Sequence, residues 1–160
     1  MNTQFAQTLF SSRGGVAALI LRVPVGLILA AHGAQKLFGW FGGYGLEGTA
    51  QWLASIGLAP GTLMALLAGG AEFFGGLALV LGLLTRPAAL VSAFTMLVAI
   101  FAVHIGNGLF MSNNGYEYAL SLFAVTLALA IQGAGRFALD NLLMARFADA
   151  GAGQRAVAGK

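Results

Sequence analysis

The amino-acid sequence predicts an all-α membrane protein, folded as one antiparallel bundle of four transmembrane helices within residues 1–148. Of its 160 residues, 59% are hydrophobic and 8% are charged, whereas about 25% of residues are charged in an average soluble domain. Four apolar runs each approach the roughly 20 residues that a helix needs to cross a bilayer, and none alternates apolar with polar residues as a transmembrane β-strand does. These runs cover about 15–37, 61–84, 87–106 and 117–134.

The first run is expected to stay in the membrane as an anchor. Residues 1–12 contain no Lys or Arg, and Arg22 would interrupt the apolar segment of a signal peptide, so a cleaved leader is not predicted. The connection after this run, about 39–59, contains "LEGTAQWLASIGL", for which we predict a short helix on the outer interface of the membrane. Trp40 and Trp52 fit the aromatic belt of a membrane protein.

The later runs are separated by sequences typical of helix ends and loops. Pro60 and Pro87 stand where the second and third runs begin, and proline favours the first turn of a helix. The connection "LLTRPAA" is very short, so the two helices that it joins must be antiparallel neighbours. The segment "GNGLFMSNNG" (106–115) has the Gly, Asn and Ser content of a loop. After the fourth run, "RFALDNLLMARFA" (136–148) predicts a cytoplasmic interfacial helix, and 149–160 is expected to be a disordered tail.

The basic residues predict the orientation, because Lys and Arg gather on the cytoplasmic side of membrane proteins. Lys36 is the one basic residue expected on the external side. The residues assigned to the cytoplasmic side are Arg13, Arg86, Arg136, Arg146, Arg155 and Lys160. Both termini are therefore predicted to be cytoplasmic. Since the charges lie beside apolar runs, and do not alternate with aromatic residues on a polar surface, the expected partner is the lipid bilayer and not a nucleic acid.

The chain contains no cysteine. Disulfide bonds, thiol relays, iron–sulfur ligation and thiolate zinc sites are therefore excluded. Any redox chemistry would have to use a bound cofactor or metal.

Two charged residues fall inside the predicted spans, Arg22 in the first and Glu72 in the second. A charge near the bilayer centre costs roughly 2.5–3.5 kcal/mol on insertion scales. At a rise of 1.5 Å per residue, the depths of the two residues differ by about 7 Å, which an extended arginine can span. We therefore predict a buried Arg22–Glu72 ion pair, either structural or part of a ligand site. Small residues surround Glu72 and favour close helix packing over space for a flat ligand. They are Gly69, Gly70, Gly75 and Gly76.

Polar side chains also gather where three of the spans reach the external side. His32, Gln35 and Lys36 are spaced i, i+3 and i+4, so one helical face carries all three. The third span contributes two polar residues here, and the fourth opens with Tyr116, Glu117 and Tyr118. The candidate ligand-binding residues are His32, Gln35, Lys36, Glu72, His104, Asn107, Tyr116 and Glu117. This set predicts a polar pocket inside the bundle near the external side.

Three interpretations of this pocket remain open. Imidazole, hydroxyl and ammonium groups donate to carbonyl oxygens, and histidine relays protons, so the pocket suits a quinone headgroup. His32 and His104 could instead ligate a metal or a b-type haem, an interpretation that we do not favour because their spacing carries no fingerprint. No metal site is predicted. In the third interpretation, the same groups only close the outer mouth of the bundle with hydrogen bonds.

The chain resembles the DoxX family of small bacterial inner-membrane proteins over roughly 16–143. The resemblance rests on six motifs in order: "HGAQKLFG", "AEFFGG", "GLLTRPAAL", "VHIGNG", "GYEYAL" and "GAGRFALD". The matching positions are Arg22, His32, Gln35, Lys36, Glu72, Arg86, His104, Asn107, Tyr116, Glu117 and Asp140. One departure is Ala138, where relatives often carry a serine that would cap the following helix. The resemblance implies a four-helix bundle in the inner membrane with a connection to redox chemistry.

The polar pocket and the resemblance together favour a redox-linked accessory subunit that binds a quinone-like ligand, with a soluble or membrane-bound redox partner. Two other functions stay open, namely a non-enzymatic scaffold or assembly factor and a small-solute carrier. Four helices without an inverted repeat make a poor alternating-access carrier, although a homo-oligomer could supply the missing half. Whether the chain is an enzyme also stays open. If it is one, we expect a subunit of a membrane quinone-linked oxidoreductase.

Overall fold

The computed structural model describes residues 15–146, and every regular element in that range is helical. The expected tail and the basic residues at positions 13, 155 and 160 lie outside the described residues. The main helices are α2 (Gly15–Phe38), α3 (Gly45–Ser55), α4 (Gly61–Leu81), α5 (Thr85–Ala99) and α6 (Glu117–Gln132). The predicted all-α class is confirmed for this part of the chain.

Three helical stretches are long and apolar enough to cross a membrane: Gly15–Phe38, Gly61–Leu81 and Thr85–Asn107. The fourth apolar helix, Glu117–Gln132, has 16 residues, which corresponds to about 24 Å at 1.5 Å per residue. That length falls short of the roughly 30 Å hydrocarbon core. Within the described residues, three of the four expected spans are therefore supported by length, and the fourth crossing stays a prediction.

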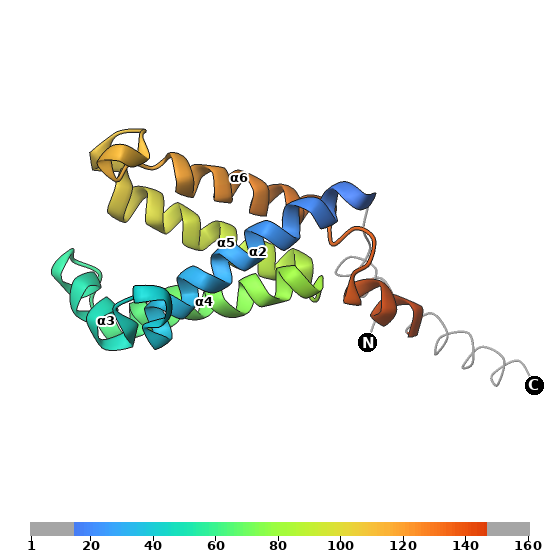
Figure 1. The fold of residues 1–160 in the computed structure, drawn as a ribbon, viewed down its shortest axis with the longest axis horizontal. Coiled ribbons are helices and arrows are strands. Elements are labelled where there is room, and N and C mark those ends of the chain that lie inside the picture. Colours follow the sequence, from blue (N-terminus) through green and yellow to red (C-terminus); the bar gives the residue numbers. More distant parts are fainter. Residues whose placement is uncertain (1–14, 147–160) are drawn as a thin grey trace, which may run out of the picture.

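The four long helices form two antiparallel pairs, in which α2 packs along α4 and α5 packs along α6. The pairs come together where α4 turns into α5 and diverge toward the end that carries α3 (Figure 1). We call these the Arg22 end and the α3 end of the bundle. The two pairs are thus farther apart at the α3 end than at the Arg22 end (Figure 1).

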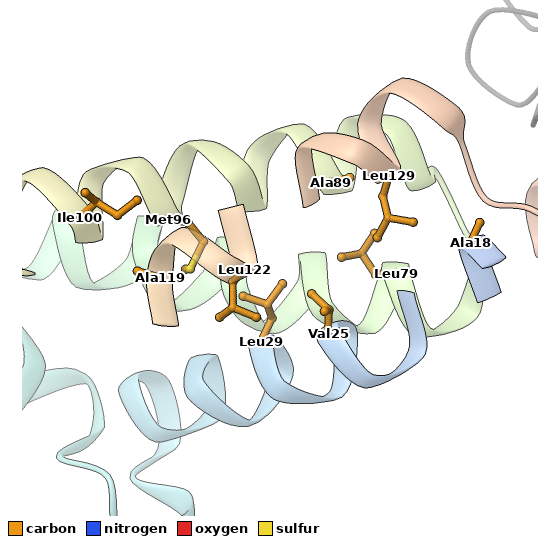
Figure 2. Close-up of a cluster of buried hydrophobic side chains, with 10 residues drawn as sticks. All are labelled: Ala18, Val25, Leu29, Leu79, Ala89, Met96, Ile100, Ala119, Leu122 and Leu129. Atoms are coloured by element: carbon orange, nitrogen blue, oxygen red, sulfur yellow. The ribbon is translucent and has the colours of Figure 1, made fainter. Parts of the chain in front are cut away.

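Between the pairs lies a core of buried apolar side chains from all four helices (Figure 2). Leu29 of α2, Leu79 of α4 and Leu129 of α6 are each fully buried. Met96 and Ile100 continue this core along α5 toward the α3 end. The core therefore holds the two pairs together over most of their length.

Glycines set the close approach of α2 and α4. A Cβ added to Gly33 would lie 2.3 Å from the backbone nitrogen of Phe73, and one added to Gly76 would lie 2.5 Å from the carbonyl oxygen of Gly26. A side chain at either position would collide with the backbone of the partner helix. The packing interpretation is confirmed for Gly69 and Gly76, whose added Cβ atoms would meet α2, whereas one at Gly70 would meet nothing within 4 Å.

Replacing Gly76 with alanine is expected to lower the free energy of unfolding by about 1–3 kcal/mol, the usual cost of overpacking a core. Gly70→Ala is the matched control on the same helix. It should leave stability unchanged or raise it by up to about 1 kcal/mol, the helix propensity gained over glycine. Titration with SDS in mixed micelles measures both. Equal effects of the two substitutions would contradict this account of the α2–α4 crossing.

The Arg22 end is closed by the segment after α6. A helical stretch over 139–146 follows it, and Asp140 accepts hydrogen bonds from the backbone nitrogens of Leu84 (2.7 Å) and Thr85 (2.9 Å). A carboxylate in this position satisfies free N–H groups at the start of α5 and interacts favourably with the helix dipole. Helices are thus present after the first and fourth predicted spans, as expected. Their location at the membrane interface stays a prediction.

At the α3 end, α5 does not stop at its last α-helical residue. It continues as one π-helical turn, Ile100–His104, followed by a 3₁₀ turn, Ile105–Asn107. Single π-helical turns are rare and often occur at functional sites. The π turn here ends on His104, one of the candidate ligand-binding residues.

Candidate functional site

A cavity of about 290 Å³ lies between the two helix pairs at the α3 end. Its lining is mostly apolar, with Leu29 from α2, Met96 from α5 and Leu122 from α6 among the residues that form it. A smaller number of polar side chains come from both pairs. Those that bear an ionisable or hydroxyl group are His32, Lys36, Glu72, Thr95, His104 and Tyr118. This is the composition typical of a small-molecule site, in which a few polar groups orient a ligand against apolar walls.

The charged centre of the cavity is an ion pair between α2 and α4. The Lys36 Nζ atom lies 2.5 Å from Oε2 of Glu72. The Glu72 side chain is 5% exposed and that of Lys36 is 27% exposed. A buried carboxylate needs such a partner, because an isolated charge costs several kcal/mol to remove from water. Lys36 is therefore the partner that offsets the cost of burying the Glu72 carboxylate.

The predicted Arg22–Glu72 ion pair is wrong. Arg22 is buried at the opposite end of the bundle and donates to the carbonyl oxygens of Leu79 (2.9 Å) and Val80 (2.5 Å) in the last turn of α4. It also donates to Ala134, and a fourth bond reaches the next loop at the carbonyl of residue 137. Carbonyl groups in the last turn of a helix lack partners within the helix, and the guanidinium satisfies them instead of reaching toward the bilayer centre.

The two histidines line the same cavity from different pairs. His32 on α2 faces Tyr118 on α6, with 5.9 Å between ring centroids and 3.5 Å between Nε2 and the hydroxyl oxygen. The Nδ1 atom of His104 lies 2.8 Å from the carbonyl oxygen of Asn114. Because a carbonyl can only accept, Nδ1 must be the donor in this hydrogen bond, and in the neutral form of the ring Nε2 is then an acceptor. In residues 15–146, no group of three or more His, Asp or Glu side chains is assembled that could hold a metal ion.

Two candidate residues on the ends of α2 and α6 do not line this cavity. The side-chain amide of Gln35 donates to the carbonyl of Phe41 (3.3 Å) and so braces the turn after α2. Tyr116 packs against the apolar core. These two positions therefore have a structural role in the described fold.

Two further candidates hold the loop between α5 and α6. The amide of Asn107 donates to the carbonyl of Asn114 (3.2 Å), the same oxygen that His104 contacts. The carboxylate of Glu117 accepts from the backbone nitrogen of Met111 (2.6 Å). The structure thus brings together His32, Lys36, Glu72 and His104 at the cavity, and it uses Asn107 and Glu117 to order the loop beside it.

The sequence analysis placed Tyr118 in the external polar cluster but not among the candidate ligand-binding residues, and it placed Trp52 in neither. Tyr118 lines the cavity together with Leu122, four residues later on α6, so the helical period could have identified it. Trp52 was interpreted as part of the aromatic belt. It reaches the cavity because α3 folds back onto α4, where Leu53 packs against Ala65, and no local pattern predicts that docking.

Comparisons with known proteins agree with the motifs. The family profile that matches is DoxX, over residues 17–105. CatD of Bacillus subtilis, whose assigned name calls it a candidate oxidoreductase, is 36% identical over 125 residues, which cover 78% of this chain and 85% of CatD. Two Escherichia coli proteins named inner membrane proteins are also similar: YqjF at 34% identity (80% of this chain, 92% of YqjF) and YphA at 31% identity (82% and 94%). No solved structure matches.

Proposed function

The chain belongs to the DoxX family and lies in the bacterial inner membrane, and on that basis we propose that it is a redox-linked accessory protein whose cavity binds a quinone-like ligand. The observation that carries the proposal is the cavity itself, where both helix pairs bring polar groups to an apolar space. The name of CatD, which calls that relative a candidate oxidoreductase, supports the redox connection.

The cavity has the size and chemistry for a ring with two carbonyl oxygens. Its volume of about 290 Å³ is at the lower end of the roughly 300–1,000 Å³ of ligand pockets, which suits one substituted ring. The Lys36 ammonium and the Tyr118 hydroxyl are donors for carbonyl oxygens, and Nε2 of His104 accepts from the hydroxyl of a reduced ring. The chain has no cysteine, so electrons would pass between this ligand and a partner protein.

The proposal includes an orientation. Arg86 lies in the first turn of α5, and Arg136 and Arg146 come after α6, so all three are at the Arg22 end, whereas Lys36 stands at the α3 end. Because basic residues favour the cytoplasmic side, the α3 end and its cavity face the external side. In this arrangement α6 forms the fourth crossing, with both chain ends cytoplasmic.

Quinone binding can be measured with the two tryptophans of the chain. Trp52 lines the cavity and Trp40 does not, so a Trp40→Phe variant in mild detergent carries one tryptophan that reports on the cavity. Titration with a short-chain ubiquinone analogue is expected to quench its fluorescence in a saturable manner. Lipid extraction and mass spectrometry of the purified protein should also yield a quinone. If none copurifies and quenching does not saturate, the proposal fails.

Two tyrosines at the start of α6, two positions apart, provide a matched pair of variants for the same titration. Tyr118→Phe removes a hydroxyl from the cavity, and His32→Ala removes its neighbour; each is expected to weaken binding by about tenfold, the worth of roughly one hydrogen bond of 1.4 kcal/mol. Tyr116→Phe, which removes a hydroxyl that does not line the cavity, should leave the affinity unchanged. Equal losses in both tyrosine variants would point to a structural effect.

One observation favours a scaffold as the second candidate function. His104, Asn107 and Glu117 are bonded to the loop between α5 and α6, so part of the polar cluster is explained without a ligand. A scaffold should keep its partner in a pull-down after Tyr118→Phe and His32→Ala, whereas these variants should lose quinone binding under the first proposal.

A further inference from the structure

A second hollow of about 690 Å³ lies beside the cavity, between α3 and the turn that follows α2. We call it the vestibule. Its side-chain lining includes Gln35, Lys36, Tyr44, Gln51, Trp52 and Ser55. Two of these residues, Lys36 and Trp52, also line the cavity. The cavity and the vestibule are therefore neighbours that share a wall made by these two side chains.

The position of this wall follows from the two faces of α3. Tyr44, Gly48 and Trp52 are spaced i, i+4 and i+8 and border the vestibule. The opposite face carries Ala50 and Leu53, which are buried against α4. Docking of that apolar face brings the helix against the bundle, so the Trp52 ring lies at the boundary between the two hollows.

The two hollows differ in where they lie. The vestibule is lined by residues of α3 and of the turn after α2, and Tyr44 at its rim is 86% exposed. The cavity behind the wall is mostly apolar and lies between membrane helices. The wall is also thin, since the indole of Trp52 is 44% exposed and the Lys36 side chain is 27% exposed while it holds Glu72. The exposed vestibule and the cavity between the helices therefore meet at the side chains of Lys36 and Trp52, which both of them share.

We infer that the vestibule is the aqueous entrance of the cavity, through which water and a small hydrophilic reactant reach the bound ligand, and that Trp52 closes this entrance. The ligand itself would enter from the lipid between the diverging helix pairs. The identity of that ligand depends on the proposed function. The aqueous route does not depend on it, since it follows from the two hollows and the side chains that they share.

Because the native chain has no cysteine, one introduced thiol can report on this route. Ala68→Cys places a thiol on α4 in the cavity lining, and Ser55→Cys places one in the vestibule. Val91→Cys, on the exposed face of α5 and in neither hollow, is the control for a lipid-facing position. Each full-length variant is treated in cells and in inverted vesicles with a membrane-impermeant, positively charged methanethiosulfonate, and the rate of thiol labelling is measured.

The expected result is fast labelling at position 55, slow labelling at position 68 and none at position 91, all from the side of the α3 end. Adding Trp52→Ala should speed labelling at position 68 by about tenfold or more, in proportion to the accessible thiolate. Trp52→Phe keeps a ring in the wall and should speed it far less. Trp40→Ala, which removes the other tryptophan, should change nothing.

Three outcomes would overturn the inference. These are labelling at position 68 that is independent of residue 52, labelling at position 68 only from the opposite side, and an equal effect of Trp40→Ala. A misfolded Trp52→Ala variant would show altered labelling at position 55. In that case the inference is judged from the Trp52→Phe variant and from the labelling rates at positions 55 and 68 in the protein that keeps Trp52. These labelling rates do not depend on whether a quinone binds. The aqueous route and quinone binding can therefore each be contradicted without the other.

Discussion

Replacing Arg22 with methionine is expected to lower the free energy of unfolding by about 3–5 kcal/mol, the usual cost of breaking a buried charged network. Its guanidinium donates to four carbonyl oxygens in two segments distant in sequence, the last turn of α4 and the stretch after α6. The side chain is 1% exposed, so water cannot replace these bonds. Gly82, whose added Cβ would lie 3.0 Å from the guanidinium carbon, leaves the room that Arg22 needs.

Two variants make this test specific. Arg22→Lys keeps the charge but has fewer donors in a different geometry, so its loss should be intermediate. Arg136→Met removes an exposed arginine that stacks on Phe137, and it should change stability by less than about 0.5 kcal/mol, as surface substitutions do. SDS titration of the purified proteins measures all three. A loss in Arg22→Met no larger than that in Arg136→Met would show that the network contributes little.

The second large effect is expected at the cavity. Lys36→Met removes the partner of a carboxylate that is 5% exposed, and it should lower the free energy of unfolding by about 3 kcal/mol, since an unpaired buried charge remains. The double variant Lys36→Met/Glu72→Gln removes that charge and should recover most of the loss. Such recovery is the signature of two residues that act as one unit.

The matched control for this cycle is Glu47→Gln, which neutralises an exposed carboxylate on α3 and should have almost no effect. Stability is again measured by SDS titration, with the quinone analogue absent, so the result does not depend on the proposed ligand. If Lys36→Met and the double variant lose the same stability, Glu72 does not depend on Lys36, and the ion pair is not the charged centre of the cavity.

The helices could be predicted closely because apolar runs and Gly/Pro punctuation both mark their ends. The expected run 15–37 became Gly15–Phe38, and 117–134 became Glu117–Gln132. What the sequence could not supply was the length of the fourth helix relative to a bilayer, since the left-handed backbone of Gly133 ends it early. The π turn before Ile105 was also not predictable, because it changes the backbone hydrogen bonds without changing the apolar pattern.

The site could be predicted only where one helix carries the pattern. The i, i+4 spacing grouped His32 with Lys36, and both line the cavity. Helical rise gave a height for Arg22 but not the direction in which its side chain extends, and that direction is set by carbonyl groups in the last turn of another helix. Trp52 was missed for a related reason, since its place depends on how α3 docks.

The two ends of the bundle are energetically separable. Lys36 follows Arg22 by 14 residues on the same helix, a distance of about 21 Å at 1.5 Å per residue. Substitutions this far apart, with no shared partners, usually add within about 0.5 kcal/mol. A gain in stability near Arg22 can therefore offset a loss beside Lys36 without altering the side chains that line the cavity. Positions that line the cavity are thus free to diverge while the hydrogen bonds of Arg22 preserve the packing at the other end of the bundle.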